Sequence, residues 1–188
     1  MKMQTSPQQL EQHSVAMTVT LVSWGMMFAT LFLGYFLVRF NSAVWPPVEL
    51  TGMPKALPLI STLVMALSSL TYWMMEKSAF TNESKSKMFW GLTFALGLVF
   101  LACQWNLWID LKANGIVVGN GQVSSMLYGF TWLHAGHIAL ALMGLLWLAW
   151  FVFFKRENLS IIKIINVGKF WHFLGIIWLL MYLMLFVL

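Results

Sequence analysis

One apolar stretch, residues 127–154, constrains the fold of this chain more than any other. It contains no Asp, Glu, Lys or Arg, yet two histidines, His134 and His137, lie three positions apart within it. On a helix with about 100° between successive residues, both imidazoles fall on one stripe together with Leu127, Thr131, Ala141 and Gly144. The opposite side carries Trp132, Ile138, Leu142, Leu146 and Trp147. Because lipid cannot hydrogen-bond an imidazole, we expect this stripe to face another helix of the protein.

The composition excludes a water-soluble domain. Hydrophobic residues make up 60% of the chain and charged residues 9%, whereas soluble domains carry about 25% charge. The single cysteine, Cys103, excludes a disulfide framework and a cysteine metal cluster. The net charge of +5 is spread over loops rather than gathered in a patch, so it indicates membrane orientation and not a nucleic-acid partner.

Uncharged runs predict where the chain crosses the membrane. They cover residues 12–38, 56–75, 88–109, 113–154 and 170–188, and a spanning helix needs about 20 apolar residues. The fourth run contains GIVVGNGQ, whose glycines break a helix, so a loop precedes a helix that starts near Ser124. We therefore predict an all-α membrane protein with one domain, residues 15–188, behind a polar tail, residues 1–14. Its five transmembrane helices are expected at about 15–39, 56–76, 88–109, 124–154 and 167–187.

The basic residues predict the orientation of this bundle. Eight of the eleven Lys and Arg residues fall in the tail, the second loop and the fourth loop. Only Arg39, Lys55 and Lys112 fall on the other side. The positive-inside bias therefore predicts a cytoplasmic N-terminus and a periplasmic C-terminus.

The histidines raise the question of haem or metal binding. With that orientation, His137 lies about 22 Å from the inner end of its helix, whereas His172 lies about 6 Å deep at the start of the next. His134 and His137 also point the same way from one helix, so they are unsuited to be opposite axial ligands. We therefore predict no catalytic, cofactor or metal site in this chain, and a structural or inter-helix role for His134, His137, Trp171, His172, Trp178, Tyr182 and Gln104.

Charged residues at the helix ends suggest contacts with lipid. Arg39 ends the first helix and can extend its guanidinium to the interface. Lys155 and Arg156 either hold anionic lipid headgroups or form a solvated basic flank. Every acidic residue lies in a tail, in a loop or at a helix end, which argues against a proton pump or an ion-coupled transporter core.

Several segments, in order along the chain, resemble a known family. These are SWGMMFATLFLGYFLVR followed by WPP, PLISTLVMALSSLT, LGLVFLACQW, LHAGHIALALMG and FWHFLGIIWLLMY. Together they resemble subunit III of the haem-copper respiratory oxidases, in the short five-helix bacterial form. The chain departs from that pattern at three positions where the family commonly has carboxylates. Trp24 stands in place of the Glu after Ser23, Gly175 in place of the Asp after Trp171-His172-Phe173, and Leu107, three residues after Gln104, in place of a Glu.

This resemblance implies an accessory subunit without redox cofactors, located in the bacterial inner membrane. Such a subunit packs against the catalytic subunit I and other oxidase subunits, within a respiratory complex or supercomplex that holds the haem and copper. It binds phospholipid and supports proton uptake and the integrity of the active site. The roles of the family's carboxylates do not carry over to the three positions where this chain lacks them, whereas a structural and lipid-holding role does.

Three alternatives remain open from the sequence. The partner enzyme is a cytochrome c oxidase, a quinol oxidase or a nitric oxide reductase, because electron-donor sites belong to other subunits. A second class is a small membrane b-type cytochrome that uses His134 or His137 with His172. A third is a polytopic transporter or a membrane-insertion factor.

Overall fold

The computed structural model describes residues 7–43, 45, 52–154 and 160–187. Over these residues it contains five helices that are long and apolar enough to cross a membrane, which confirms the all-helical prediction. The helices are α1 (Pro7–Asn41), α2 (Ala56–Ser78), α3 (Glu83–Ala113), α4 (Gln122–Ala149) and α5 (Ile161–Tyr182). Two π-helical turns, η2 (Trp150–Phe154) and η4 (Leu183–Val187), extend α4 and α5.

Several helices extend beyond their expected ends. α1 begins at Pro7, inside the segment expected to be a polar tail, although its membrane-length apolar part begins at Ser14. α3 begins at Glu83, where the preceding Asn82 side chain accepts a hydrogen bond from the Lys85 amide. α5 begins six residues before its expected start of 167, at Ile161, where Ser160 accepts a bond from the Ile162 amide. Hydropathy marks only the apolar part of a helix, whereas these side-chain caps determine where its backbone begins.

The loop before α4 has the turn that its glycines predict. Gly115 has a φ of 77° and Gly119 a φ of 95°, a region in which side chains with a Cβ are strained. The Tyr128 hydroxyl donates a hydrogen bond to the Ile116 carbonyl at 2.9 Å and so fixes the loop on the first turns of α4.

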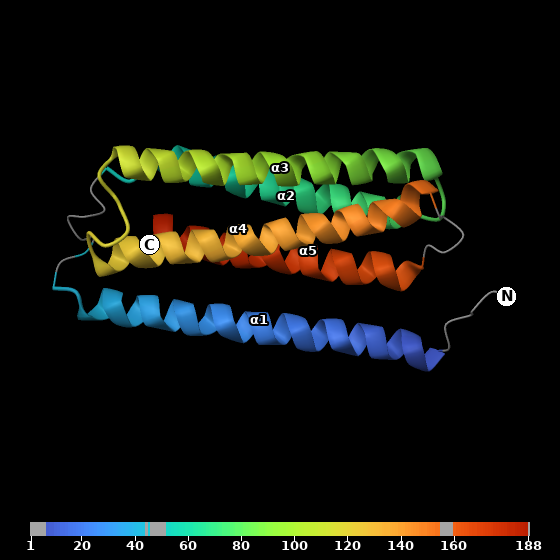
Figure 1. Ribbon diagram of the computed structural model, residues 1–188, viewed down its shortest axis with the longest axis horizontal. Helices are drawn as coiled ribbons and strands as arrows, with labels where there is room; N and C mark the ends of the chain where they lie inside the picture. Colours follow the sequence, from blue (N-terminus) through green and yellow to red (C-terminus); the bar gives the residue numbers. More distant parts are fainter. Residues whose placement is uncertain (1–6, 44, 46–51, 155–159, 188) are drawn as a thin grey trace.

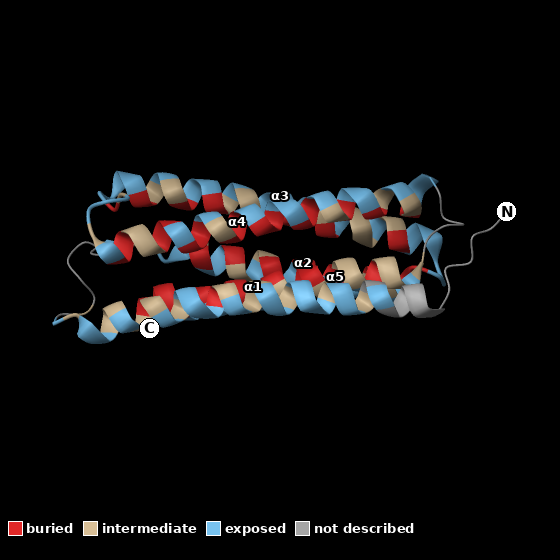
Figure 2. Ribbon diagram, turned by 60° about the horizontal axis from the view of Figure 1, so that its bottom comes forward, coloured by how far each residue is buried: buried red, intermediate tan, exposed pale blue. Residues whose placement is uncertain are grey.

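The five helices form an elongated bundle in which consecutive helices run antiparallel (Figure 1). α2 packs mainly against α3 and also against α5, and α4 packs against α3, α5 and α1. α4 and α5 thus lie between α1 and the α2–α3 pair (Figure 1). Buried residues face the inside of the bundle, and the outer faces of the helices are exposed (Figure 2).

The buried face of α4 is wider than expected. Leu127, Thr131, His134, His137 and Ala141 are buried, as the position of the stripe predicts. Ile138 and Leu142 were expected on the outer side, but both are buried as well. Ile138 lies four residues after His134 and therefore on the same face, and α4 has neighbours on three sides. Trp132, Leu146 and Trp147 are exposed.

Candidate functional site

The two histidines of α4 lie inside the bundle, in different surroundings. His134 has no exposed surface, and its ring lies 5.5 Å from the Trp178 ring, 5.8 Å from the Phe100 ring and 6.3 Å from the Phe28 ring. Neither of its nitrogens meets a hydrogen-bond partner among the described residues. His134 therefore serves as an aromatic contact between α1, α3, α4 and α5.

His137 is bonded within its own helix. Its Nδ1 lies 2.7 Å from the Leu133 carbonyl, to which the N–H donates. The ring meets Trp24 edge-on at 4.9 Å and Phe28 at 5.5 Å, both on α1. Trp24 thus fills the contact between α1 and α4 and also touches Phe170 of α5.

Two buried indoles of α5 donate hydrogen bonds to hydroxyls of α2. Trp171 Nε1 donates to Ser68 Oγ at 3.1 Å, and Trp178 Nε1 donates to Thr62 Oγ1 at 3.0 Å. Ser68 Oγ in turn donates to the Thr93 carbonyl of α3 at 3.3 Å. The first indole therefore takes part in a chain of polar contacts that joins α5, α2 and α3.

Gln104 and Trp108 make corresponding polar contacts from α3. Gln104 Nε2 donates to Ser61 Oγ of α2 at 3.3 Å, and Trp108 Nε1 donates to Thr131 Oγ1 of α4 at 3.0 Å. Both contacts join neighbouring helices through one side-chain hydrogen bond. The Ser61 and Thr62 hydroxyls of α2 thus accept hydrogen bonds from neighbouring helices and also donate to carbonyls of their own helix.

Gly175, Tyr182 and His172 of α5 have separate surroundings. Gly175 faces α2, and a Cβ added there would lie 3.1 Å from Ser69 Oγ. Tyr182 is half-buried and stacks on Phe186 of η4 at 6.2 Å. His172 is half-buried and meets the Tyr72 ring edge-on at 5.7 Å. The structure does not bring His172 together with His134 or His137, which contact other rings. Within the described ranges, no group of three or more His, Cys, Asp or Glu residues is placed to hold a metal ion.

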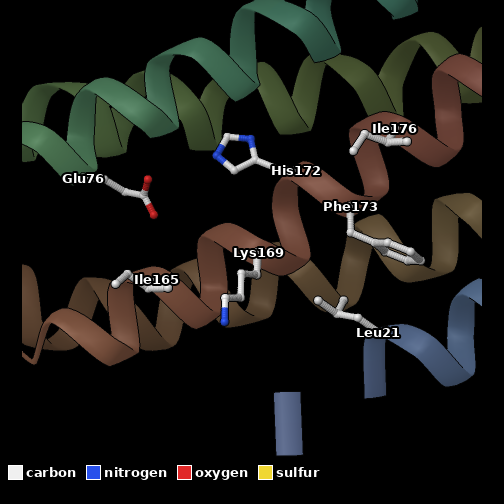
Figure 3. Close-up of a pocket in the computed structure, with 7 residues that line it drawn as sticks. All are labelled: Leu21, Glu76, Ile165, Lys169, His172, Phe173 and Ile176. Atoms are coloured by element: carbon white, nitrogen blue, oxygen red, sulfur yellow. The ribbon is translucent and has the colours of Figure 1, made fainter. Parts of the chain in front are cut away.

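A groove opens between α1, α2 and α5 near the end of the bundle where α5 begins (Figure 3). Its volume is about 470 Å³, and three polar residues line it, Glu76 of α2 with Lys169 and His172 of α5. The rest of its lining is apolar: Leu21, Ile165, Phe173 and Ile176. Sequence reasoning missed this groove, because it placed Glu76 only at a helix end. A signal was available, since Glu76 lies four residues after Tyr72 and therefore on the face of α2 that carries its packing residues.

The three basic residues proposed for lipid contact are only partly described. The Arg39 guanidinium carbon lies 5.0 Å from the centre of the Trp45 ring at the end of α1. Lys155 and Arg156 lie outside the described residues. Whether they form a headgroup site or a solvated basic flank therefore stays a prediction.

Comparisons with known proteins agree on one family. The model of the family described as cytochrome c oxidase subunit III matches residues 8–188. A probable cytochrome c oxidase subunit 3 of Mycobacterium tuberculosis is 29% identical over 183 residues, covering 92% of this chain and 86% of that protein. The cytochrome c oxidase subunit 3 of Synechocystis is 23% identical, over 89% of this chain and 72% of its own length. The cytochrome bo(3) ubiquinol oxidase subunit 3 of Pseudomonas aeruginosa is 26% identical, over 81% and 74% respectively.

Proposed function

Because the chain belongs to the cytochrome c oxidase subunit III family, we propose that it is an accessory subunit of a haem-copper terminal oxidase in aerobic respiration. In this role it carries no redox cofactor itself and packs against the catalytic subunit I, which with other subunits holds the haem and copper. It also holds phospholipid and supports proton uptake and the stability of the active site. The match over residues 8–188, nearly the whole bundle, is the observation that carries this proposal.

The way the bundle is assembled supports a packing role. The buried indoles and the Gln104 amide are engaged with hydroxyls of neighbouring helices. The outer faces carry large apolar side chains such as Trp132, Met143 and Leu146. In a bilayer, such faces are available to lipid tails and to the helices of a partner.

This chain lacks carboxylates that the family commonly has, and this bears on how it could support proton uptake. Trp24 packs against His137 and Phe170, and Gly175 admits Ser69 of α2. Both positions are used for contact between helices. We therefore propose that support of proton uptake acts through the stability of the complex, and not through a carboxylate at these positions.

We further propose a cytoplasmic N-terminus, a periplasmic C-terminus and a location in the bacterial inner membrane, with residues 15–188 as one membrane domain. The basic residues support this orientation, because Lys77, Lys85, Lys87, Lys163 and Lys169 lie at the end of the bundle where α2 ends and α5 begins. A cysteine placed in the loop after α3 is expected to react with a membrane-impermeant thiol reagent added to the periplasmic side, and one in the loop between α2 and α3 is not.

Purification of the tagged full chain tests the proposed function. In a mild detergent, we expect a haem-copper subunit to co-purify, identified by mass spectrometry and by the haem spectrum of the complex. An oxidase from cells that lack this chain is expected to turn over at first and then to lose activity faster than the complete complex. Recovery of the chain without any oxidase subunit, or with a haem spectrum that disappears on His134→Ala, would contradict the proposal.

A quinol oxidase is the second candidate for the partner, favoured by the similarity to the Pseudomonas aeruginosa ubiquinol oxidase subunit 3. Oxygen uptake by the purified complex with reduced cytochrome c, compared with uptake with a quinol, distinguishes the two. The electron donor is a property of the partner subunits, so substitutions in this chain are expected to leave the preference unchanged.

A further inference from the structure

The outer face of α3 carries a seven-residue repeat. Its positions follow one another at alternating intervals of four and three residues, and all are exposed: Met88, Leu92, Ala95, Val99, Ala102, Asn106, Ile109 and Ala113. This α3 stripe lies opposite the buried face of the helix, and the outer faces of the bundle are open (Figure 2). Such spacing keeps one side of a helix against a neighbour that crosses it at about 20°. It suits lipid as well, so the side chains on the stripe decide what covers it.

Asn106 is the strongly polar residue of the α3 stripe. It lies in the uncharged run 88–109 and seven residues before the end of α3 at Ala113, which is about 10 Å along the helix. Its Nδ2 donates to the Ala102 carbonyl at 2.8 Å. The amide has a second N–H and a carbonyl oxygen beyond this bond, and acyl chains cannot bond to either. Polar side chains at such positions in membrane helices almost always face protein or a water-filled cavity.

The exposed hydroxyls of α1 make a different case. The Ser23 hydroxyl donates to the Val19 carbonyl at 3.0 Å, and the Thr30 hydroxyl donates to the Met26 carbonyl at 2.8 Å. Because a hydroxyl has a single proton, each of these groups uses its donor within its own helix. Asn106 keeps a donor that its own helix does not use, so the outer face of α3 has the stronger need for a polar neighbour.

The arrangement of the α3 stripe favours a second copy of this chain as that neighbour. All copies are inserted in the same direction, so a two-fold axis along the membrane normal brings each residue of the stripe against itself at the same depth. A primary amide both donates and accepts, so two Asn106 side chains satisfy each other. By their spacing, Val99 and Asn106 take position a of the repeat and Ala102 takes position d. A β-branched residue and a single Asn at position a are typical of parallel two-stranded pairs.

We propose that the α3 stripe is a self-association surface, at which two copies of this chain pack in parallel with their Asn106 amides hydrogen-bonded to each other. Each amide donates the N–H that its own helix does not use to the oxygen of the other. Ala95 and Ala102 keep the surface low, which lets the two backbones approach closely. The inference goes beyond the proposed accessory function, because it joins two copies of the complex and leaves the outer faces of the other helices for oxidase subunits.

Cysteine cross-linking in membranes of cells that express the full chain tests where the two copies meet. Cys103→Ser removes the single cysteine and provides the background. In this background, Ala102→Cys is expected to give a disulfide-linked product of two chains when copper phenanthroline is added as the oxidant. Ala29→Cys on α1 is the matched control, because Ala29 is also exposed and lies twelve residues before the end of α1, against eleven for Ala102 in α3. It is expected to remain a single chain.

Substitution of Asn106 tests the hydrogen bond itself. Full chains that carry donor and acceptor fluorescent proteins are diluted in lipid vesicles, and energy transfer gives the dissociation constant of the pair. Asn106→Leu is expected to raise this constant by about threefold to thirtyfold, the range for one hydrogen bond between membrane helices. Asn106→Gln keeps an amide and is expected to retain most of the affinity. Thr30→Val, which removes an exposed polar group from α1, is the control and is expected to leave the constant unchanged.

Three results would overturn the inference. The first is a cross-linked product in which mass spectrometry finds Ala102→Cys joined to a different protein. The second is as much paired product from Ala29→Cys as from Ala102→Cys, or none from either. The third is an Asn106→Leu pair as tight as the unsubstituted one, which would mean a merely apolar contact. A thermal melt of each variant shows that the bundle is intact. An oxidase that co-purifies from the same membranes without a paired chain refutes only the self-association, whereas a paired chain without an oxidase refutes the proposed function.

Discussion

α1 and α5 are both long apolar helices, but the bundle holds them in different ways. In the most apolar stretch of α5, 44% of the residues are buried, against 11% in α1. α5 is fastened by indole hydrogen bonds to α2, whereas α1 contacts α4 mainly through rings, with Phe28 and Trp24 against His137 and with Phe32 stacked on Phe130. In a bilayer, where apolar burial alone gives little preference for protein over lipid, directed contacts and close packing determine which helix is tightly held. We therefore regard α5 as part of the rigid centre and α1 as the more loosely held helix.

Among substitutions that test this comparison, removal of a buried indole from α5 should cause the largest loss in the free energy of unfolding. Trp171→Ala opens a large cavity among α2, α3 and α5 and removes the bond to Ser68. We expect a loss of about 3–5 kcal/mol in the free energy of unfolding, measured by denaturation in mixed detergent micelles. Trp105→Ala is the control, because Trp105 is 64% exposed. If the two variants lost similar stability, the view of α5 as the rigid centre would be wrong.

A substitution at Gly97, where α3 lies closest to α4 and α5, should give the next largest loss of stability. A Cβ on Gly97 would lie 2.8 Å from both Leu142 and the Trp171 ring. Gly97→Ala should therefore lower the free energy of unfolding by about 1–3 kcal/mol through overpacking. Gly91→Ala, on the same helix with open space at its Cβ, should be neutral or slightly stabilising in the same assay.

One hydrogen bond joins α1 to η4, the π-helical turn that extends α5, and it allows the attachment of α1 to the bundle to be tested separately. The Tyr35 hydroxyl donates to the Met184 carbonyl of η4 at 3.1 Å. Tyr35→Phe should cost about 1 kcal/mol and should speed amide hydrogen exchange in α1 more than in α5. Tyr72→Phe removes the corresponding bond from α2 to Ile164 and is the comparison. Unchanged exchange in α1 would mean that ring packing alone holds this helix.

The smallest effect concerns a single bond between α5 and α2. A double-mutant cycle of Trp178→Phe and Thr62→Val isolates the bond from Trp178 Nε1 to Thr62 Oγ1. The coupling energy is expected to be about 0.6 kcal/mol, the mean for hydrogen bonds between membrane helices. A coupling near zero would leave cavity filling, and not hydrogen bonding, as the reason that α5 is held more firmly than α1.

Composition and the spacing of uncharged runs were sufficient to predict the class of fold and five membrane-crossing helices, because the bilayer demands long apolar helices whatever the details of packing. Helical periodicity also placed His134 and His137 on the inner face of α4. It misassigned Ile138 and Leu142, because the width of a buried face depends on how many neighbours surround the helix.

Only the tertiary structure decided which groups meet. The donation from Trp171 to Ser68 joins residues 103 positions apart, and no local pattern encodes the register between α5 and α2. The groove is likewise a product of packing, since Glu76 and Lys169 come from helices that approach closely because Gly168 has no side chain. The sequence alone thus determined that the chain belongs in a membrane and that the histidine stripe of α4 turns inward. Helix packing determined the contacts, because steric fit and hydrogen bonding between distant segments act only once those segments are side by side.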